Sequence, residues 1–157
     1  MSYDKLKSLV ANVEAIETAM KIKVQGRTAT QEEKAVLSRY SGFGGIKEVL
    51  NIGTDRPIGG NMDEPVRRLQ ELIDAYPYFT EPMRQAVTES IKASVLTAFY
   101  TPKFIVDAVA RQIHATFRQN GLQMRSFLEP SAGIGGFLPV AMPDTYDYAI
   151  EKDHISG

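Results

Sequence analysis

Two stretches of the chain share a glycine-rich core that could hold a nucleotide: YSGFGGI at residues 40–46 and PSAGIGGFL at residues 130–138. Glycine adopts positive φ and lets the backbone approach a ligand closely. A nucleotide-binding glycine loop also needs a strand before it and a helix after it. A helical pattern precedes residues 40–46, so these residues predict a helix C-terminus and a tight turn between helices. The alternative is that residues 40–46 bind a ligand.

Residues 130–138 have the context that a binding loop requires. The apolar pair Phe127 and Leu128 predicts a strand, which leads through Glu129 and Pro130 into a turn of small residues and then a short apolar helical stretch. We expect the turn to contact the ligand through Ser131, Ala132, Gly133 and Gly135. Glu151 stands at the end of the next predicted strand. A carboxylate at that place binds the hydroxyl pair of a ribose.

The residues around the loop favour one kind of ligand. A dinucleotide fingerprint requires glycine at position 138, where this chain has Leu138, and no Gly-Lys-Ser/Thr follows the loop as in a phosphate-binding loop. Glu129 repels a pyrophosphate and suits a cationic amino group. A ribose joined to a cationic amino acid tail describes S-adenosylmethionine. A nicotinamide cofactor remains as an alternative.

Three ordered segments resemble the cofactor half of the N6-adenine DNA methyltransferases: AFYTPKFIVDAV, FLEPSAGIGGFL and YAIEKD, within residues 97–153. The order resembles the γ type, in which the Tyr-Thr-Pro element precedes the glycine motif. The helical front, including LSRYSGFGGIKEVL, is similar to the N-terminal part of large methylase-helicase proteins of bacterial mobile elements. The resemblance implies a Rossmann-like class I methyltransferase fold, with S-adenosylmethionine as cofactor.

The resemblance also assigns roles to single residues. It places Tyr100, Thr101 and Pro102 beside the methionine portion of the cofactor, with Thr101 capping the helix that follows. The loop residues and Glu129 face the amino group and the ribose, and Glu151 accepts from both ribose hydroxyls. Lys152 stands where the family packs an apolar residue on the adenine; its alkyl stem can cover the ring instead.

The catalytic motif of the family, Asp/Asn-Pro-Pro followed by an aromatic residue, is absent, because no two of the eight prolines are adjacent. We therefore assign no catalytic residue. The resemblance implies the cofactor-binding front portion of a longer adenine-N6 DNA methyltransferase that is catalytically incomplete in this chain. Its expected partners are DNA, through the full-length protein, and the remainder of that polypeptide.

The alternative from another class is a helical DNA-positioning or protein-interaction module in residues 1–121. The cations that such a module offers to phosphates are Arg67, Arg68, Lys92, Arg111 and Arg118.

Composition narrows these possibilities. Lys and Arg total 18 against 19 Asp and Glu, which does not favour strong non-specific binding of nucleic acid. The absence of cysteine excludes disulfides and Cys-ligated metals. No run approaches 18 apolar residues, so we expect no membrane span and a cytoplasmic location.

Apolar residues at helical spacing predict the elements that position the loop. The expected fold is α/β: a helical N-terminal region (1–62), a helical segment (63–121) and an incomplete Rossmann-like unit (122–157) that begins a sheet with two strands. Helices are expected over residues 4–24, 30–40, 46–51, 64–76, 81–96 and 102–119, with a loop at 52–65 and strands within RSFLEP and YDYAIE.

Side-chain positions are predicted as well. The helix over 102–119 is expected to turn Ile105, Val109, Ile113 and Phe117 inward. Phe99 and Phe137 are expected in the core, and His114 and His154 on the surface. Because two strands make a marginal sheet, we also expect homodimer formation by pairing along a sheet edge.

Overall fold

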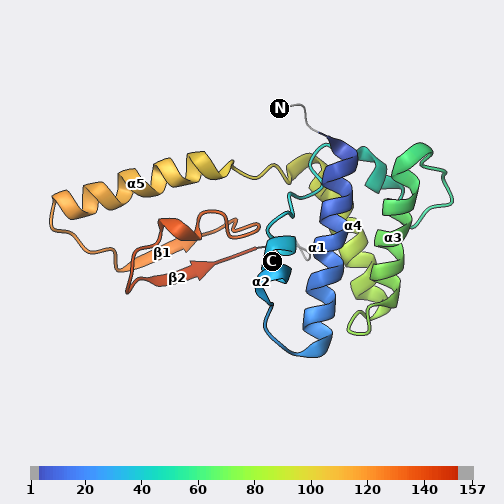
Figure 1. The fold of residues 1–157 in the computed structure, drawn as a ribbon, viewed down its shortest axis with the longest axis horizontal. Helices are drawn as coiled ribbons and strands as arrows, with labels where there is room; N and C mark the ends of the chain where they lie inside the picture. The colour runs from blue at the N-terminus through green and yellow to red at the C-terminus, as the bar shows by residue number, and fades with distance from the viewer. Residues whose placement is uncertain (1–3, 152–157) are drawn as a thin grey trace. The chain divides into compact units, whose positions relative to one another are not determined.

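A computed structural model describes residues 4–151 of the chain, which divide into two compact units, one ending at Phe99 and one beginning at Tyr100 (Figure 1). The predicted 63–121 segment therefore spans parts of both units. The chain is mainly helical, with a two-stranded parallel sheet near its C-terminal end. This agrees with the expected α/β class at a coarse level.

The first unit is built from helices whose ends are set by local signals in the sequence. Its elements are α1 (Lys5–Gln25), α2 (Gln31–Leu37), η1 (Lys47–Asn51), η2 (Gly60–Met62), α3 (Asp63–Ala75) and α4 (Glu81–Thr97). Gly26 ends α1 in the left-handed conformation, with φ 60°. Thr30 and Glu33 form a capping box at the start of α2. The expected helices of this unit are thus observed, although α2 is shorter than the predicted 30–40 and η1 is a 3-10 helix.

The core of the first unit lies where α1, α3 and α4 run side by side (Figure 1). Leu9, Leu69 and Ile73 are fully buried there, and Ile91 is 1% exposed. Each such side chain stabilises the fold by about 1.5–3 kcal/mol relative to an exposed one.

Residues 40–46 belong to this core. Phe43 and Ile46 are buried, and the buried Asn12 of α1 donates from Nδ2 to the carbonyl of Gly42 at 2.6 Å and accepts from the Ser41 amide at 2.8 Å. The prediction that the preceding helix ends within residues 40–46 is wrong, because α2 already ends at Leu37 with Ser38 as its cap. The segment is a buried connection that the side chain of Asn12 fastens.

The second unit consists of α5 (Lys103–Gln119), β1 (Ser126–Glu129), η3 (Leu138–Val140) and β2 (Tyr146–Ala149). The two strands pair in parallel, with Ser126 opposite Tyr146 and Glu129 opposite Ala149. Helix α5 runs antiparallel to both strands (Figure 1), so its N-terminus lies at the same end of the unit as their carboxyl ends. This arrangement gathers the predicted site residues.

The face that α5 buries differs from the predicted one. Val106 and Ala110 are buried and form a small cluster with Val140, whereas Ile105 and Val109 are 41% and 37% exposed. Ile113, Phe127 and Phe137 pack against this cluster as partly buried side chains. The buried face of α5 therefore includes Val106 and Ala110, each one position after the predicted Ile105 and Val109.

Two further side-chain predictions are wrong. Phe99 is 68% exposed rather than in the core. His114 is part-buried rather than on the surface, since its Nε2 lies 2.9 Å from the carbonyl oxygen of Val140. His154 lies outside the described residues.

Candidate functional site

The glycine loop continues from the carboxyl end of β1 and is fastened to the end of β2. The amide of Ile150 donates to the carbonyl of Glu129 at 2.9 Å, which extends the pairing beyond the last strand residues. The amide of Ala132 then donates to the carbonyl of Ile150, also at 2.9 Å. The loop thus lies over the carboxyl edge of the parallel sheet, where ligands bind in open α/β sheets.

Glu151 holds the loop through a side-chain hydrogen bond. Its Oε2 accepts from the amide of Gly133 at 2.5 Å in a part-buried setting. Gly133 and Gly135 have φ of 52° and 72°, which confirms the expected positive φ at these positions. The amide of Gly135 donates to the carbonyl of Ala132 at 2.7 Å and closes the turn. In the structure, the carboxylate of Glu151 thus fixes the loop at Gly133.

Tyr100 covers the same glycine. A Cβ atom built on Gly133 would lie only 2.6 Å from Cε1 of the Tyr100 ring. Position 133 therefore requires glycine for two reasons, its positive φ and the ring packed against it. The structure brings Tyr100, Gly133 and Glu151 together, although Tyr100 and Gly133 lie 33 positions apart in the sequence.

Glu129 stands at the start of the loop. One of its carboxylate oxygens, Oε1, accepts from the amide of Ser131 at 3.2 Å. This bond turns the chain locally and uses one acceptor site of a group that offers about four. Glu129 is half-buried at the carboxyl edge of the sheet, beside the loop, as its place in the sequence indicated.

Two features expected from the sequence are corrected by the structure. Pro102 is the N-cap of α5 and no side chain caps the helix, so the prediction that Thr101 caps it is wrong. The helical stretch after the loop is only the three-residue 3-10 helix η3. A helix dipole therefore contributes little on that side of the loop, because the macrodipole requires a run of aligned peptide units.

Thr101 and Pro102 are exposed and lie beside Tyr100 at the start of α5. Lys152 lies outside the described residues. Within residues 4–151 no group of three or more His, Cys, Asp or Glu side chains has a geometry that could hold a metal ion. Among the same residues, no helix is long and apolar enough to cross a membrane.

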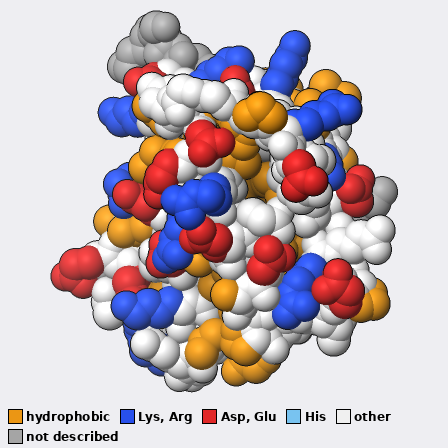
Figure 2. All heavy atoms as spheres, turned by 90° about the vertical axis from the view of Figure 1, so that its right-hand side faces the viewer, with side chains coloured by type: hydrophobic (Ala, Val, Ile, Leu, Met, Phe, Trp, Pro, Cys, Tyr) orange, Lys and Arg blue, Asp and Glu red, His pale blue; other side chains and the backbone are white. Residues whose placement is uncertain are grey.

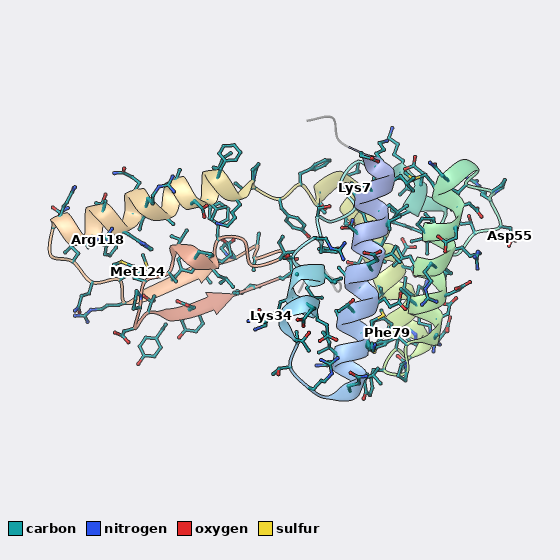
Figure 3. All side chains as sticks on the ribbon, viewed as in Figure 1. Lys7, Lys34, Asp55, Phe79, Arg118 and Met124 are labelled. Atoms are coloured by element: carbon teal, nitrogen blue, oxygen red, sulfur yellow. The ribbon has the colours of Figure 1, made fainter. Side chains whose placement is uncertain are left out.

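The cations of the alternative DNA-positioning module are largely engaged with carboxylates. Arg67 pairs with Glu71, Arg68 with Glu17 at 2.5 Å, and Lys92 with Glu89 at 3.2 Å. Figure 2 shows the face on the right-hand side of Figure 1. Acidic and basic side chains are interspersed on that face, and they form no continuous basic patch there. Arg118 lies near the C-terminal end of α5, at the end of the second unit opposite the carboxyl ends of the strands (Figure 3).

Two contacts at the site could not have been predicted from the spacing of residues in the sequence. The Tyr100 ring against Gly133 joins segments far apart in the chain, and the Glu151 bond to the loop depends on the strand register. The only sequence signal for either is the resemblance, which places all three residues around one ligand. Comparisons with protein-family models, curated proteins and solved structures give no match to this chain.

Proposed function

We propose that this chain is the cofactor-binding portion of an S-adenosylmethionine-dependent adenine-N6 DNA methyltransferase, with Rossmann-like folding in its second unit. The observation that carries the proposal is the convergence of Tyr100, Gly133 and Glu151 at the carboxyl ends of two parallel strands. The proposal also rests on the motif order of the sequence, in which the Tyr-Thr-Pro element, the glycine loop and the acidic strand end follow one another.

The chemistry of Glu151 fits a ribose. A carboxylate has two oxygens with about four acceptor sites. The Gly133 amide donates to Oε2, and two vicinal hydroxyls would donate one to each oxygen. A carboxylate oxygen can accept more than one hydrogen bond, so the bond from Gly133 does not by itself prevent binding of the hydroxyl pair.

The chemistry of Glu129 fits the other end of the same ligand. Its carboxylate lies beside the loop, where a phosphate would be repelled and an ammonium attracted. The carboxylate accepts a hydrogen bond from the Ser131 amide within the loop. The remaining acceptor sites of this carboxylate would orient a cationic amino acid tail.

DNA and the remainder of a longer polypeptide are the partners that we propose. Homodimer formation through a sheet edge is a further proposal, since β1 and β2 form a two-stranded sheet in the described residues and each has one edge without a strand. Light scattering over a concentration series tests it: a dimer is expected, and a monomer at all concentrations would contradict edge pairing.

Calorimetric titration with S-adenosylhomocysteine tests the cofactor assignment. In Glu151→Gln one oxygen remains to accept from Gly133, but the pair of charged acceptors is lost. We expect its affinity to fall about tenfold, equivalent to about 1.4 kcal/mol. Asp147→Asn is the matched control, because Asp147 is an exposed carboxylate on β2, the strand that leads to Glu151, and lies upstream of the site.

The result that would contradict the proposal is equal affinity in Glu151→Gln and Asp147→Asn. Stronger binding of NAD than of S-adenosylhomocysteine would instead support the nicotinamide alternative.

A further inference from the structure

The glycine loop of the second unit is joined to the short helix η3 by consecutive turns. The amide of Leu138 donates to the carbonyl of Gly135 at 3.1 Å, and the amide of Ala141 donates to the carbonyl of Leu138 at 3.0 Å. The Leu138 side chain also packs on the loop, since a Cβ atom built on Gly135 would lie 2.9 Å from its Cδ1 atom. The downstream side of the loop therefore depends on where η3 is held, whereas its upstream side is bonded to the sheet.

Val140, the last residue of η3, attaches this short helix to α5. Its side chain is 3% exposed and packs with Val106 and Ala110 of α5. Its carbonyl lies at the C-terminal end of η3, where a helix supplies no partner for its last carbonyls. Because a buried carbonyl without a partner is destabilising, this group requires a donor from outside η3.

His114 of α5 supplies that donor. Its Nε2 atom lies 2.9 Å from the carbonyl oxygen of Val140 in a part-buried setting. A carbonyl oxygen only accepts hydrogen bonds, so the proton of the neutral ring must be on Nε2, and Nδ1 carries the lone pair. Both residues belong to the second unit, so the contact lies entirely within the part of the chain that carries the loop.

We propose that His114 is a positioning residue for the candidate cofactor loop. Its Nε2–H group holds the carbonyl of Val140, the attached η3 fixes Leu138, and Leu138 restricts the loop at Gly135. The inference rests on the proposed function for the identity of the ligand, and it deepens that function by naming a residue that acts on the loop through η3. Its first two tests need no ligand.

The position of the ring proton is tested first, in the wild-type chain. NMR spectra that correlate the ring nitrogens with the ring protons distinguish the two neutral tautomers. His114→Gln identifies the signals of His114, because the chain has two histidines. We expect the proton on Nε2 at a pH at which the ring is neutral. A proton on Nδ1 would overturn the inference, because Nε2 could then not donate to Val140.

Hydrogen exchange at the amides of Gly135 and Leu138 is the second test. His114→Phe keeps an aromatic ring and removes the donor, whereas His114→Gln retains a side-chain NH group. Gln112→Ala is the matched control, because Gln112 is an exposed polar residue of the same helix. We expect exchange to be about tenfold faster in His114→Phe, with a smaller change in His114→Gln and none in Gln112→Ala.

Two results of the exchange experiment would overturn the inference. Faster exchange in His114→Phe that is confined to Ala141 would mean that the effect ends in η3 and does not reach the loop. Equal acceleration in His114→Phe and His114→Gln would mean that the loss of the ring, and not the loss of the donor, disturbs the loop. His114→Ala replaces His114→Phe if the phenylalanine variant does not fold.

The affinity of the same variants for S-adenosylhomocysteine separates this inference from the proposed function. Weaker binding in His114→Phe that is largely restored in His114→Gln supports both. Wild-type affinity in His114→Phe overturns positioning and leaves the proposed function in place. A wild-type chain that binds no S-adenosylhomocysteine, but shows the expected exchange changes in His114→Phe, supports positioning of the loop and removes the cofactor assignment alone.

Discussion

The two units of this chain differ in how much apolar surface each buries. The first has helices packed on one another, with more than a dozen buried apolar side chains among its described residues. In the second, the buried apolar cluster is Val106, Ala110 and Val140. The candidate site lies in the second unit, so its glycine loop is carried by the part of the molecule with the smaller core.

The sheet shows the same contrast on its two faces. Phe127 packs toward the cluster under α5, whereas its neighbour Leu128 is 58% exposed. Tyr146, Tyr148 and Ile150 are also more than half exposed. Parallel sheets are usually covered on both faces. The second unit is therefore expected to open locally more often than the first.

The two glycine-rich stretches differ in the same way. Residues 40–46 are held by hydrogen bonds to Asn12 and to the end of α4, and their Phe43 side chain is buried. Residues 130–138 are fastened mainly at one edge, through Ala132 and Gly133. Similar sequences thus serve a buried connection in one unit and an accessible loop in the other. Each of the four predictions that follow concerns a substitution in one of the two units, so that the effects in the two units can be compared.

The largest effect is expected in the core of the first unit. Phe43→Ala removes an aromatic ring that is 1% exposed, and we expect it to lower the free energy of unfolding by about 3–5 kcal/mol. Urea denaturation followed by circular dichroism of the helices measures this change. A loss no larger than that of a surface substitution would contradict the account of residues 40–46 as part of the core.

A smaller effect is expected in the second stretch. Gly133→Ala forces alanine into a φ of 52° and against the Tyr100 ring, which we expect to destabilise the loop by about 1–3 kcal/mol. Gly136→Ala is the control, since its Cβ meets nothing within 4 Å and its φ is not positive. Hydrogen exchange at the amides of residues 131–135 compares the two. Equal exchange in both variants would show that the ring contact does not restrict the loop.

The two faces of the sheet offer a matched pair of substitutions. We expect Phe127→Ala to destabilise the second unit by about 0.5–3 kcal/mol and Leu128→Ala to be nearly neutral. The difference arises because only Phe127 packs against the buried cluster. Hydrogen exchange of the strand amides reports the change. A larger effect of Leu128→Ala would indicate that the exposed face is covered in solution.

The smallest effect is expected at the start of α2. The hydrogen bond from Arg27, together with that from the Thr30 amide, lowers the pKa of Glu33 from its ordinary 4.5 to about 2. A lowered carboxyl pKa contributes stability that is complete above the ordinary value and is lost as the pH falls toward 2. We expect Arg27→Gln to raise the pKa of Glu33, measured by NMR titration of its carboxyl carbon. An unchanged value would mean that the ion pair does not form in solution.

Local signals in the sequence predict much of the first unit. The capping box at Thr30, Gly26 after α1 and Pro82 in the first turn of α4 all lie at the ends of observed helices. Such signals act within a few residues and need no knowledge of the fold. The sequence did not predict the burial of Asn12, because its partners Ser41 and Gly42 are far away in the chain.

The candidate site is predictable only in part. Turn chemistry indicates positive φ at Gly133 and Gly135, as observed. The capping role expected for Thr101 fails because the helix begins after Pro102. The bond between Glu151 and Gly133 depends on how the loop returns over β2, which neither periodicity nor composition encodes.

We propose that the loop at residues 130–136 and Glu151 bind S-adenosylmethionine or its product. Titration of the isotopically labelled chain with S-adenosylhomocysteine, followed by the amide resonances of Gly133, Gly135 and Glu151, tests this most directly. The account predicts saturable shifts concentrated at these amides, with those of residues 40–46 changing less. Amides of the loop that do not move at millimolar ligand, or shifts concentrated elsewhere in the chain, would contradict it.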